Sequence, residues 1–291
     1  MKKVKTAIFP VGGLGTRFLP ATKSMPKEML PIANKPIIQY AFEEARRSGI
    51  EKFIFITGRN KDAINNHFDH SFELESHLNI DNKSAELEKV IGWLPNAGNI
   101  IFIRQQEPLG LGHAIWCARH LIADDEPFLV SLADELIMEE KTDQTFLSKM
   151  IDSYHQKGEG ANIIAVDQID KKDSNKYGII SFNDQGQILD MHEKPDPKDA
   201  LSDLAITGRY ILQPKIFDYL AKTEKGKGGE IQLTDAMRVM GKENPFYFTK
   251  IDRKRFDCGN ILGYVEANIA YALSNDDIKE DVKEILKKNL S

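Results

Sequence analysis

The chain has 291 residues, of which 41% are hydrophobic and 29% charged, a globular composition with enough length for a sizeable core. A formal net charge of -5 at pH 7 argues against nonspecific binding to nucleic acid or to an anionic membrane. No apolar stretch is long enough to span a bilayer, and Cys117 and Cys258 share no spacing typical of a metal site or a disulfide framework. We therefore expect a cytoplasmic protein without a nucleic-acid or membrane partner.

The first predicted strand, residues 7–11, runs directly into a glycine-rich loop. Three glycines and two cations follow within a short span: Gly12, Gly13, Gly15, Arg17 and Lys27. Bare amide groups beside cations suit a polyphosphate, so this segment predicts a nucleotide site. The loop lacks the Lys-Ser or Lys-Thr of a Walker loop, and Phe18 stands where a dinucleotide fingerprint needs a small residue. For the glycines alone, an ordinary strand-to-helix turn is the alternative.

Strand and helix patterns alternate through the first half of the chain. The predicted elements are a helix at 36–48, a strand at 52–57, a polar helical insertion at 62–99, a strand at 100–104, a helix at about 113–121, and strands at 127–132 and 161–166. This alternation is typical of an α/β fold with a mostly parallel sheet and helices on both faces.

A second glycine turn, Gly110 to Gly112, precedes the helix near residue 113. Gln105 lies just before it and can both donate and accept hydrogen bonds, as a nucleobase edge requires. His113 stands at the start of the helix, where we interpret it as structural and not as a general base.

Two carboxylates stand where they could hold a metal ion. Asp134 ends an apolar strand, and open α/β sheets bind ligands at the carboxyl ends of their strands. Asp257 lies in a glycine-bearing turn before an apolar helix. Carboxylate oxygens suit Mg²⁺ that is shared with phosphates. Taken singly, each acid is better explained by capping, of the following helix or turn for Asp134 and of a helix for Asp257, and the sequence alone does not bring the two together.

After about residue 170 the pattern changes to short strands at 177–182, 188–193 and 205–212, which predict an antiparallel or mixed second lobe for a second substrate. One strand ends at Glu193, Lys194 and Pro195. The carboxylate suits sugar hydroxyls and the ammonium suits a phosphate, although a solvated strand end explains the same residues. Proline favours an extended backbone at Lys194, so we expect the two charged side chains to point apart.

Taken in order, these segments resemble the bacterial UTP–glucose-1-phosphate uridylyltransferases over nearly the whole chain. The resemblance is carried by the glycine loop, Pro26-Lys27-Glu28-Met29-Leu30-Pro31, His67-Phe68-Asp69, Gly110-Leu111-Gly112-His113-Ala114, Tyr177-Gly178, Glu193-Lys194-Pro195, Gly208-Arg209-Tyr210, Glu230-Ile231-Gln232-Leu233-Thr234-Asp235-Ala236 and Asp257-Cys258-Gly259-Asn260. It implies a Rossmann-like nucleotidyltransferase fold with a smaller β-containing sugar-binding lobe. We expect one domain, 1–291, with a nucleotide half to about 135, a sugar-phosphate half to about 260 and C-terminal helices beyond.

The resemblance also implies the reaction: UTP and glucose 1-phosphate give UDP-glucose and pyrophosphate, with Mg²⁺, by direct attack of the sugar phosphate on the α-phosphorus. By motif, the nucleotide would be held by Val11, Gly12, Gly13, Gly15, Thr16, Gln105 and Gly110. The catalytic cations would be Arg17, Lys27 and Lys194, and the Mg²⁺ ligands Asp134 and Asp257. The sugar phosphate would meet Gly178, Glu193, Lys194 and Glu230.

Three alternatives stay open at this point. The same chemistry could use dTTP or galactose 1-phosphate, because one methyl group separates thymine from uracil. The other two are a Rossmann oxidoreductase, against which Phe18 argues, and a catalytically silent paralogue, against which the intact motif cations and acids argue. The predicted helix at 276–289 keeps an apolar face, which suits packing on the body or a homo-oligomer, a dimer or a tetramer.

Overall fold

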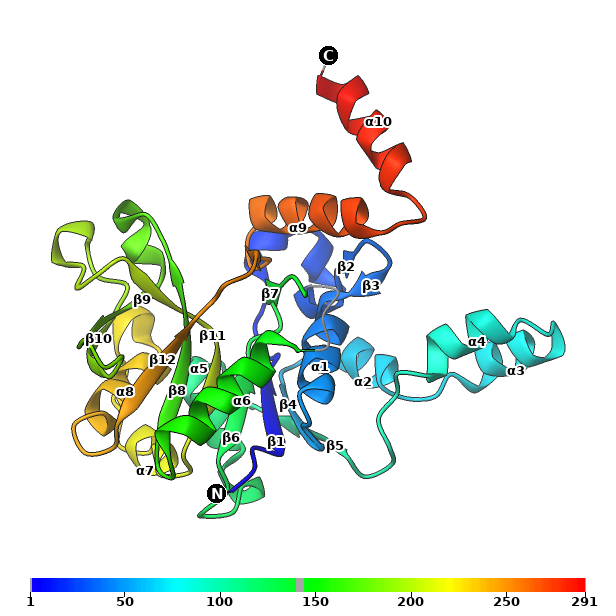
Figure 1. Cartoon of the computed structure of the whole chain (residues 1–291). Helices are drawn as coiled ribbons and strands as arrows, with labels where there is room; N and C mark the ends of the chain where they lie inside the picture. Colours follow the sequence, from blue (N-terminus) through cyan, green and yellow to red (C-terminus); the bar gives the residue numbers. More distant parts are fainter. Residues whose placement is uncertain (1, 140–143, 291) are drawn as a thin grey trace.

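The structure is a computed structural model that describes residues 2–139 and 144–290. One central sheet runs through the body, with helices on both faces (Figure 1). Among the described residues the sheet has nine strands, in the order β10-β9-β11-β6-β1-β4-β5, and β8 and β12 join it through β11. The predicted α/β class with a mostly parallel, mixed sheet is confirmed.

The first half of the sheet is parallel. It consists of β1 (Thr6–Pro10), β4 (Lys52–Thr57), β5 (Ile100–Arg104) and β6 (Phe128–Ser131). The strand β1 is apolar throughout because both of its faces are covered: Ile8 packs in the core on one side of the sheet and Phe9 in the core on the other. The covering helices include α1 (Ile37–Arg47) and α5 (Leu111–Cys117).

The second half is largely antiparallel, as predicted. It consists of β8 (Asn162–Gln168), β9 (Gly178–Phe182), β10 (Ile188–Glu193), β11 (Leu204–Leu212) and β12 (Phe246–Lys250). The strand β11 is antiparallel to β6, β8 and β9, whereas β12 runs parallel to β8. Three helices pack on this half: α6 (Phe146–Lys157), α7 (Ile216–Leu220) and α8 (Leu233–Met240).

Two small sheets lie outside the main one, and the sequence did not predict them. One pairs β2 (Pro31–Ile32) with β3 (Lys35–Pro36). The other pairs β7 (Glu135–Ile137) with β13 (Arg255–Asp257), with Asp257 opposite Glu135. This second pair joins segments about 120 residues apart in the chain. It therefore decides where the predicted metal ligands meet.

The predicted insertion at 62–99 is helical. It forms α2 (Asp62–His67), α3 (Phe72–Ile80) and α4 (Ser84–Ile91), and the last two project from the body as an arm (Figure 1). The chain closes with α9 (Ile261–Ser274), which packs over β2 and β13, and α10 (Lys279–Leu290), which points away from the body (Figure 1). No residue of α10 is buried. None of the helices in the described part of the chain combines the length and apolarity of a membrane span.

Candidate active site

A cavity of about 510 Å³ opens at the carboxyl ends of β1, β5 and β6. Ligands are expected at this edge of an open α/β sheet. The residues around the cavity include nine of the predicted site residues: Gly12, Gly13, Gly15, Thr16, Lys27, Gln105, Gly110, Asp134 and Glu230. Val11 is buried beneath the loop, and its N–H donates to the Ile56 carbonyl at 2.9 Å.

Two positions in the cavity wall leave little or no room for a side chain, because neighbouring atoms lie close to the glycine backbone. A Cβ on Gly12 would lie 3.2 Å from Gln105 Oε1. Gly110 has a φ of 103°, in the left-handed region, and a Cβ there would lie 2.7 Å from the Cβ of Glu230. Glu230, which was predicted on the sugar side, therefore packs against the nucleotide turn.

The side-chain nitrogen of Gln105, Nε2, already has hydrogen-bond partners within the protein. Its Nε2 donates to the Gly110 carbonyl at 3.1 Å and lies 3.0 Å from His113 Nδ1. This orientation directs Oε1 toward Gly12, where it can accept a hydrogen bond from a base N–H group. His113 also stacks on Trp116 with the ring centroids 6.0 Å apart, so its place is structural, as we interpreted it.

Lys27 lies under the glycine loop and holds Asp134. Its Nζ is 2.5 Å from Asp134 Oδ2, and a Cβ on Gly13 would lie 3.6 Å from Lys27 Cε. Burial opposes the charged lysine, but the carboxylates of Asp134 and Glu28 outweigh it and raise the pKa of Lys27 above its ordinary value. Burial likewise opposes the ionised Asp134, and Lys27 holds the pKa of that carboxyl below its ordinary value. Both groups are charged at neutral pH.

The two predicted metal ligands and Arg17 meet around Gly259. A Cβ on Gly259 would lie 2.9 Å from Asp257 Oδ1, 3.0 Å from Asp134 Oδ2 and 3.7 Å from Arg17 Nη1. Arg17 Nη1 donates to the Gly259 carbonyl at 3.4 Å. The sequence could not bring these groups together, but the β7–β13 pairing does.

Neither acid caps a helix. Asn260 caps α9, because its Oδ1 accepts from the Gly263 N–H at 2.9 Å. Asp257 Oδ1 instead accepts from the Gly259 N–H at 2.9 Å. Asp134 is followed by the strand β7 and not by a helix. The capping role had been the stronger interpretation for each acid alone, because a single chain position carries no information about what it faces.

The donor set fits Mg²⁺ that is shared with a substrate. Nowhere in residues 2–139 and 144–290 do three or more His, Cys, Asp or Glu side chains gather in a way that could hold a metal by themselves. Mg²⁺ usually keeps several waters and takes one or two protein carboxylates plus substrate phosphates. Asp134 and Asp257 offer such an incomplete set of hard oxygen ligands.

Arg255 lies two residues before Asp257 in β13 and contacts Glu135, and no local sequence pattern predicts it as a site residue. Its Nη1 donates to Glu135 Oε2 at 2.7 Å, its Nε donates to Asp167 Oδ2 at 2.8 Å, and its guanidinium lies 5.5 Å from the Tyr177 ring centre. Burial raises the pKa of Glu135 to about 7, with Asp257 and Asp134 adding to the effect and Arg255 opposing it. Arg255 thus offsets negative charge next to the predicted metal ligands.

The predicted sugar residues gather at the end of β10. Glu193 is opposite Gly178 across the β9–β10 pair, and a Cβ on Gly178 would lie 3.3 Å from Glu193 Oε2. Both carboxylate oxygens have partners: Lys194 Nζ lies 3.1 Å from Oε1, and Thr234 Oγ1 donates to Oε2 at 2.7 Å. Thr234, in the first turn of α8, was not predicted as a site residue.

The expected backbone of Lys194 is wrong. Its φ is 47°, in the left-handed region that few side chains adopt, and its Nζ lies beside Glu193 instead of pointing away. Its N–H donates to the Tyr177 carbonyl at 2.9 Å, which continues the β9–β10 ladder past the strand end. That bond and the ion pair together outweigh the steric preference before proline.

The structure does not place every predicted site residue in one cavity. Glu193 lines a neighbouring hollow of about 360 Å³ with Asp235 and Arg238. The two sides are joined through Arg255, which contacts Glu135 beside the metal ligands and Tyr177 beside Gly178.

Comparison with known proteins identifies the family. The profile of the family described as "Nucleotidyl transferase" matches residues 6–274. A UTP–glucose-1-phosphate uridylyltransferase of Staphylococcus saprophyticus is 45% identical over 99% of both chains. The chain belongs to the bacterial UTP–glucose-1-phosphate uridylyltransferases. Among solved structures, the UTP-bound enzyme from Acinetobacter baumannii superposes with a TM-score of 0.88 at 36% identity, covering 97% of this chain and 98% of the other.

A second solved member of this uridylyltransferase family is a UDP-glucose pyrophosphorylase complexed with UDP-glucose. It has a TM-score of 0.82 at 40% identity and covers 94% of this chain and 100% of the other. The likeness extends over both halves of the sheet and therefore includes both groups of site residues. Membership in this family argues against the oxidoreductase alternative.

Proposed function

We infer that the chain catalyses uridylyl transfer from UTP to glucose 1-phosphate, which yields UDP-glucose and pyrophosphate. The observation that carries this is the meeting of Arg17, Asp134 and Asp257 around Gly259, next to a glycine-lined cavity, in a chain of this family. Relatives named for this activity match along 99% of the chain. We place the enzyme in the cytoplasm, where nucleoside triphosphates and sugar phosphates are available.

On this proposal the cavity holds UTP. Gln105 Oε1 would accept from the uracil N3–H, with the backbone of Val11, Gly12, Gly13 and Gly110 around the base. Gly15 and Thr16 would lie along the triphosphate, with Arg17 and Lys27 as its cations. Gln105 can hold thymine by the same edge, so preference for uracil over thymine would come from space near the base and not from this hydrogen bond.

Charge neutralisation is the main task of the site, because both substrates are anions. Two unit charges about 4 Å apart repel by about 4 kcal/mol at an effective dielectric of 20, and about 1.4 kcal/mol corresponds to tenfold in rate. Lys194 would hold the attacking phosphate, while Arg17 and Lys27 offset charge on the triphosphate. Mg²⁺ bound by Asp134 and Asp257 would supply Lewis acidity and a template for both substrates.

We propose direct transfer without a covalent enzyme intermediate. The sugar phosphate is already ionised and needs no strong base, so the residues have to orient and neutralise it rather than remove a proton. Glu193 and Gly178 would contact the glucose, and Glu230 is a further candidate for that side. Isolation of a uridylyl-enzyme after incubation with labelled UTP would contradict direct transfer.

The decisive experiment is pyrophosphate release with a matrix of nucleotides and sugar 1-phosphates. We expect UTP with glucose 1-phosphate to give the highest kcat/KM and turnover to stop when EDTA removes divalent cations. Faster turnover with dTTP or galactose 1-phosphate would favour the alternative substrates. No release with any pair would favour the silent paralogue.

We also propose that the enzyme is a homo-oligomer, a dimer or a tetramer. The helix α9 exposes Ile261, Leu262, Val265 and Ile269, α10 exposes Ile285, and Ile278 is exposed just before α10 begins. Exposed apolar side chains that the body does not cover are typical of an interface. A second copy of the chain would supply the same face and so cover both.

A further inference from the structure

Arg209 is the largest fully buried side chain of the described residues, and nothing in the proposed mechanism uses it. It lies in β11, is 1% exposed, and belongs to the Gly208-Arg209-Tyr210 segment that the sequence resemblance included without a role. Its guanidinium has five N–H donors in a fixed fork. A buried arginine of this kind has to satisfy all of them, so its partners show what it holds.

Two of those partners flank the predicted metal ligand Asp134. Arg209 Nη1 donates to the Leu132 carbonyl at 2.7 Å, and Nη2 donates to the Glu135 carbonyl at 2.9 Å. A second Nη1 bond, to the Gly208 carbonyl, is 3.1 Å long. The guanidinium therefore clamps the backbone two residues before Asp134 and one residue after it.

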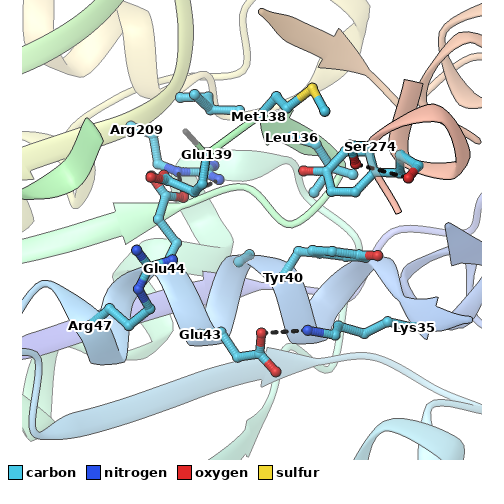
Figure 2. Close-up of a pocket in the computed structure, with 13 residues that line it drawn as sticks. Lys35, Tyr40, Glu43, Glu44, Arg47, Leu136, Met138, Glu139, Arg209 and Ser274 are labelled. Atoms are coloured by element: carbon cyan, nitrogen blue, oxygen red, sulfur yellow. Dashed lines mark hydrogen bonds and ion pairs between the residues drawn. The ribbon is translucent and has the colours of Figure 1, made fainter. Parts of the chain in front are cut away.

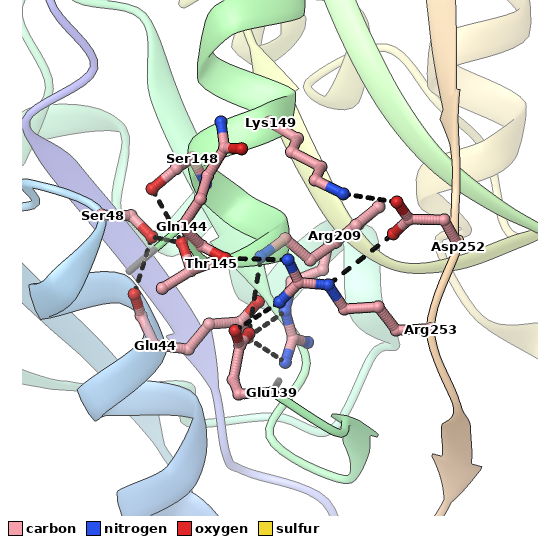
Figure 3. A network of polar contacts seen from close by, with 11 residues as sticks. Glu44, Ser48, Glu139, Gln144, Thr145, Ser148, Lys149, Arg209, Asp252 and Arg253 are labelled. Carbon is pink, nitrogen blue, oxygen red and sulfur yellow. Dashed lines mark hydrogen bonds and ion pairs between the residues drawn. The ribbon is translucent and has the colours of Figure 1, made fainter. Parts of the chain in front are cut away.

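The remaining N–H donors of Arg209 bind Glu44, a residue of α1. Arg209 Nε and Nη2 donate to Glu44 Oε2 at 3.1 and 2.9 Å (Figure 3). Glu44 is 5% exposed, so the ion pair is buried away from solvent. Its two hydrogen bonds fix the orientation of the guanidinium relative to the carboxylate. With these two bonds, all five donors of Arg209 are used.

Gly208, the residue before Arg209, packs closely against the 132–135 loop. A Cβ on Gly208 would lie 2.7 Å from the Cβ of Leu132 and 2.8 Å from the Cγ of Glu135. Only glycine lets β11 approach the 132–135 loop closely enough for the neighbouring Arg209 to reach both carbonyls. The Gly208-Arg209 pair thus acts as a unit on the backbone that carries Asp134.

We propose that Arg209 is a positioning residue for the metal site, which fixes Asp134 by clamping the carbonyls on either side of it. The inference rests on the proposed role of Asp134 as a Mg²⁺ ligand. Groups that orient metal ligands from behind typically change metal affinity or activity by about 10- to 100-fold when they are removed. Loss of the clamp therefore weakens the binding of a divalent cation without touching either substrate.

The test is Arg209→Lys. Lysine keeps the positive charge near Glu44, but its three donors all lie on one ammonium nitrogen. It therefore cannot reach the Leu132 and Glu135 carbonyls at the same time as Glu44. A cavity of about 270 Å³ adjoins Arg209 and Glu44, with Leu136, Tyr40 and Tyr271 among its walls, so the shorter side chain and water have room (Figure 2). The readout is the dissociation constant of Mn²⁺, measured by electron paramagnetic resonance with saturating UTP, together with the Mg²⁺ concentration for half-maximal turnover.

Arg253→Lys is the matched control. Arg253 is also buried, with its side chain 3% exposed, and it belongs to the same network through Glu139 at 2.6 Å and the Gln144 carbonyl at 2.8 Å (Figure 3). Its polar partners in the part of the chain that the structure describes are Glu139, Gln144 and Asp252, which lie outside the 132–135 loop. The Arg253→Lys variant therefore shows how much Mn²⁺ binding changes when this polar network loses hydrogen bonds that do not involve the 132–135 loop.

We expect Arg209→Lys to raise the Mn²⁺ dissociation constant and the Mg²⁺ requirement about tenfold, with Arg253→Lys within twofold of wild type. Equal effects of the two variants, or a lowered melting temperature with unchanged metal binding, would overturn the proposal. If Arg209→Lys does not fold, Glu44→Asp replaces it. This variant shortens by one methylene the side chain that binds Arg209, and the same changes in Mn²⁺ dissociation constant and Mg²⁺ requirement are expected.

Asp134→Asn separates this inference from the function on which it rests. If Asp134→Asn abolishes Mn²⁺ binding and Arg209→Lys leaves it unchanged, the positioning role is wrong and the metal role of Asp134 stands. If neither variant changes Mn²⁺ binding, the metal role itself is wrong, and the role of Arg209 is wrong with it.

Discussion

At the scale of single residues, charges at the site are matched before any substrate binds. Lys27 holds Asp134, and Lys194 holds Glu193. Partly buried charges need such partners, since an unpaired ion loses the solvation of water without compensation. Substrate binding on the proposed mechanism is therefore an exchange of partners, in which a phosphate replaces a carboxylate beside each lysine.

Lys194→Ala tests the sugar-phosphate side. A hydrogen bond to a charged group contributes about 1.5–3 kcal/mol, so we expect the KM for glucose 1-phosphate to rise about 10- to 100-fold. The KM for UTP should change little, because Lys194 does not line the nucleotide cavity. Steady-state kinetics with each substrate varied in turn measures both values. Lys198→Ala, at an exposed lysine of the same lobe, is the control. Equal losses for both substrates would contradict the assignment.

Thr234 gives a second test on the same side, through the orientation of Glu193. Thr234→Val keeps the shape of the side chain but removes the hydroxyl that donates to Glu193 Oε2. Loss of one such bond is worth about 1.5 kcal/mol, so the KM for glucose 1-phosphate should rise about tenfold. Thr234→Ser keeps the hydroxyl and should restore the wild-type value. If the serine variant is as impaired as the valine variant, packing and not the hydrogen bond is the role of this residue.

Among the secondary-structure elements, two strands of only three residues each determine the site. The main sheet places the glycine loop and Asp134 at one edge, but only the three-residue pair β7–β13 carries Asp257 to them. The turn before α5 similarly packs on residues 230–231: the Gly112 N–H donates to the Ile231 carbonyl at 2.9 Å. Long-range pairings of this kind connect the two halves of the chain around the cavity.

Gly110→Ala tests the packing of that turn. Gly49→Ala is the matched control, because Gly49 also has a positive φ, 87°, but a Cβ there would meet nothing within 4 Å. A positive φ alone costs about 1–3 kcal/mol, so both variants should lose free energy of unfolding. Gly110→Ala should lose more of it, because φ 103° with ψ 178° is a conformation that is essentially confined to glycine. Only Gly110→Ala also collides with Glu230 and should weaken UTP binding, measured by calorimetry. Unchanged UTP affinity in Gly110→Ala would remove the turn from the nucleotide site.

The sequence predicted long, strongly patterned elements well and short ones poorly. The strands at 52–57, 100–104 and 188–193 were predicted to the residue, since apolar runs bounded by polar residues are a local signal. The strands β7 and β13 have three residues each and no pattern of their own, because they are stabilised by each other. Arg255 and Thr234 were missed for the same reason: each acts through a partner far away in the chain. The left-handed Lys194 went against a local rule, as residues at functional sites often do.

In the molecule as a whole, one continuous sheet carries the residues that we propose for both substrates. The strand β11 pairs with β6, beside the proposed nucleotide site, and with β9, beside the proposed sugar site. Arg209, on that same strand, clamps the loop of Asp134. On the proposed mechanism, a shift of β9 relative to β6 would therefore move the proposed metal ligand Asp134. Alignment of the two anionic substrates then depends on the integrity of the sheet.

The C-terminal helices expose several large apolar side chains. In α10, Ile285 is 58% and Leu290 87% exposed, although the helix is amphipathic. A lone helix of this length is marginal in water, since most helical stability in proteins comes from packing an apolar face. The helix α10 therefore needs a partner to persist, and the proposed oligomer supplies one.

Ile285→Glu tests this at the face itself. Light scattering should give a mass that is a multiple of 32.9 kDa for the unaltered chain and a smaller multiple for the variant, because a carboxylate would be buried without a partner in the interface. Lys287→Glu makes a larger charge change on the same helix, and it should leave the mass unchanged if the apolar face makes the contact. Turnover per subunit should persist in both variants, since the site lies on the main sheet and β13. A monomeric unaltered chain, or equal dissociation of both variants, would exclude α10 as the interface.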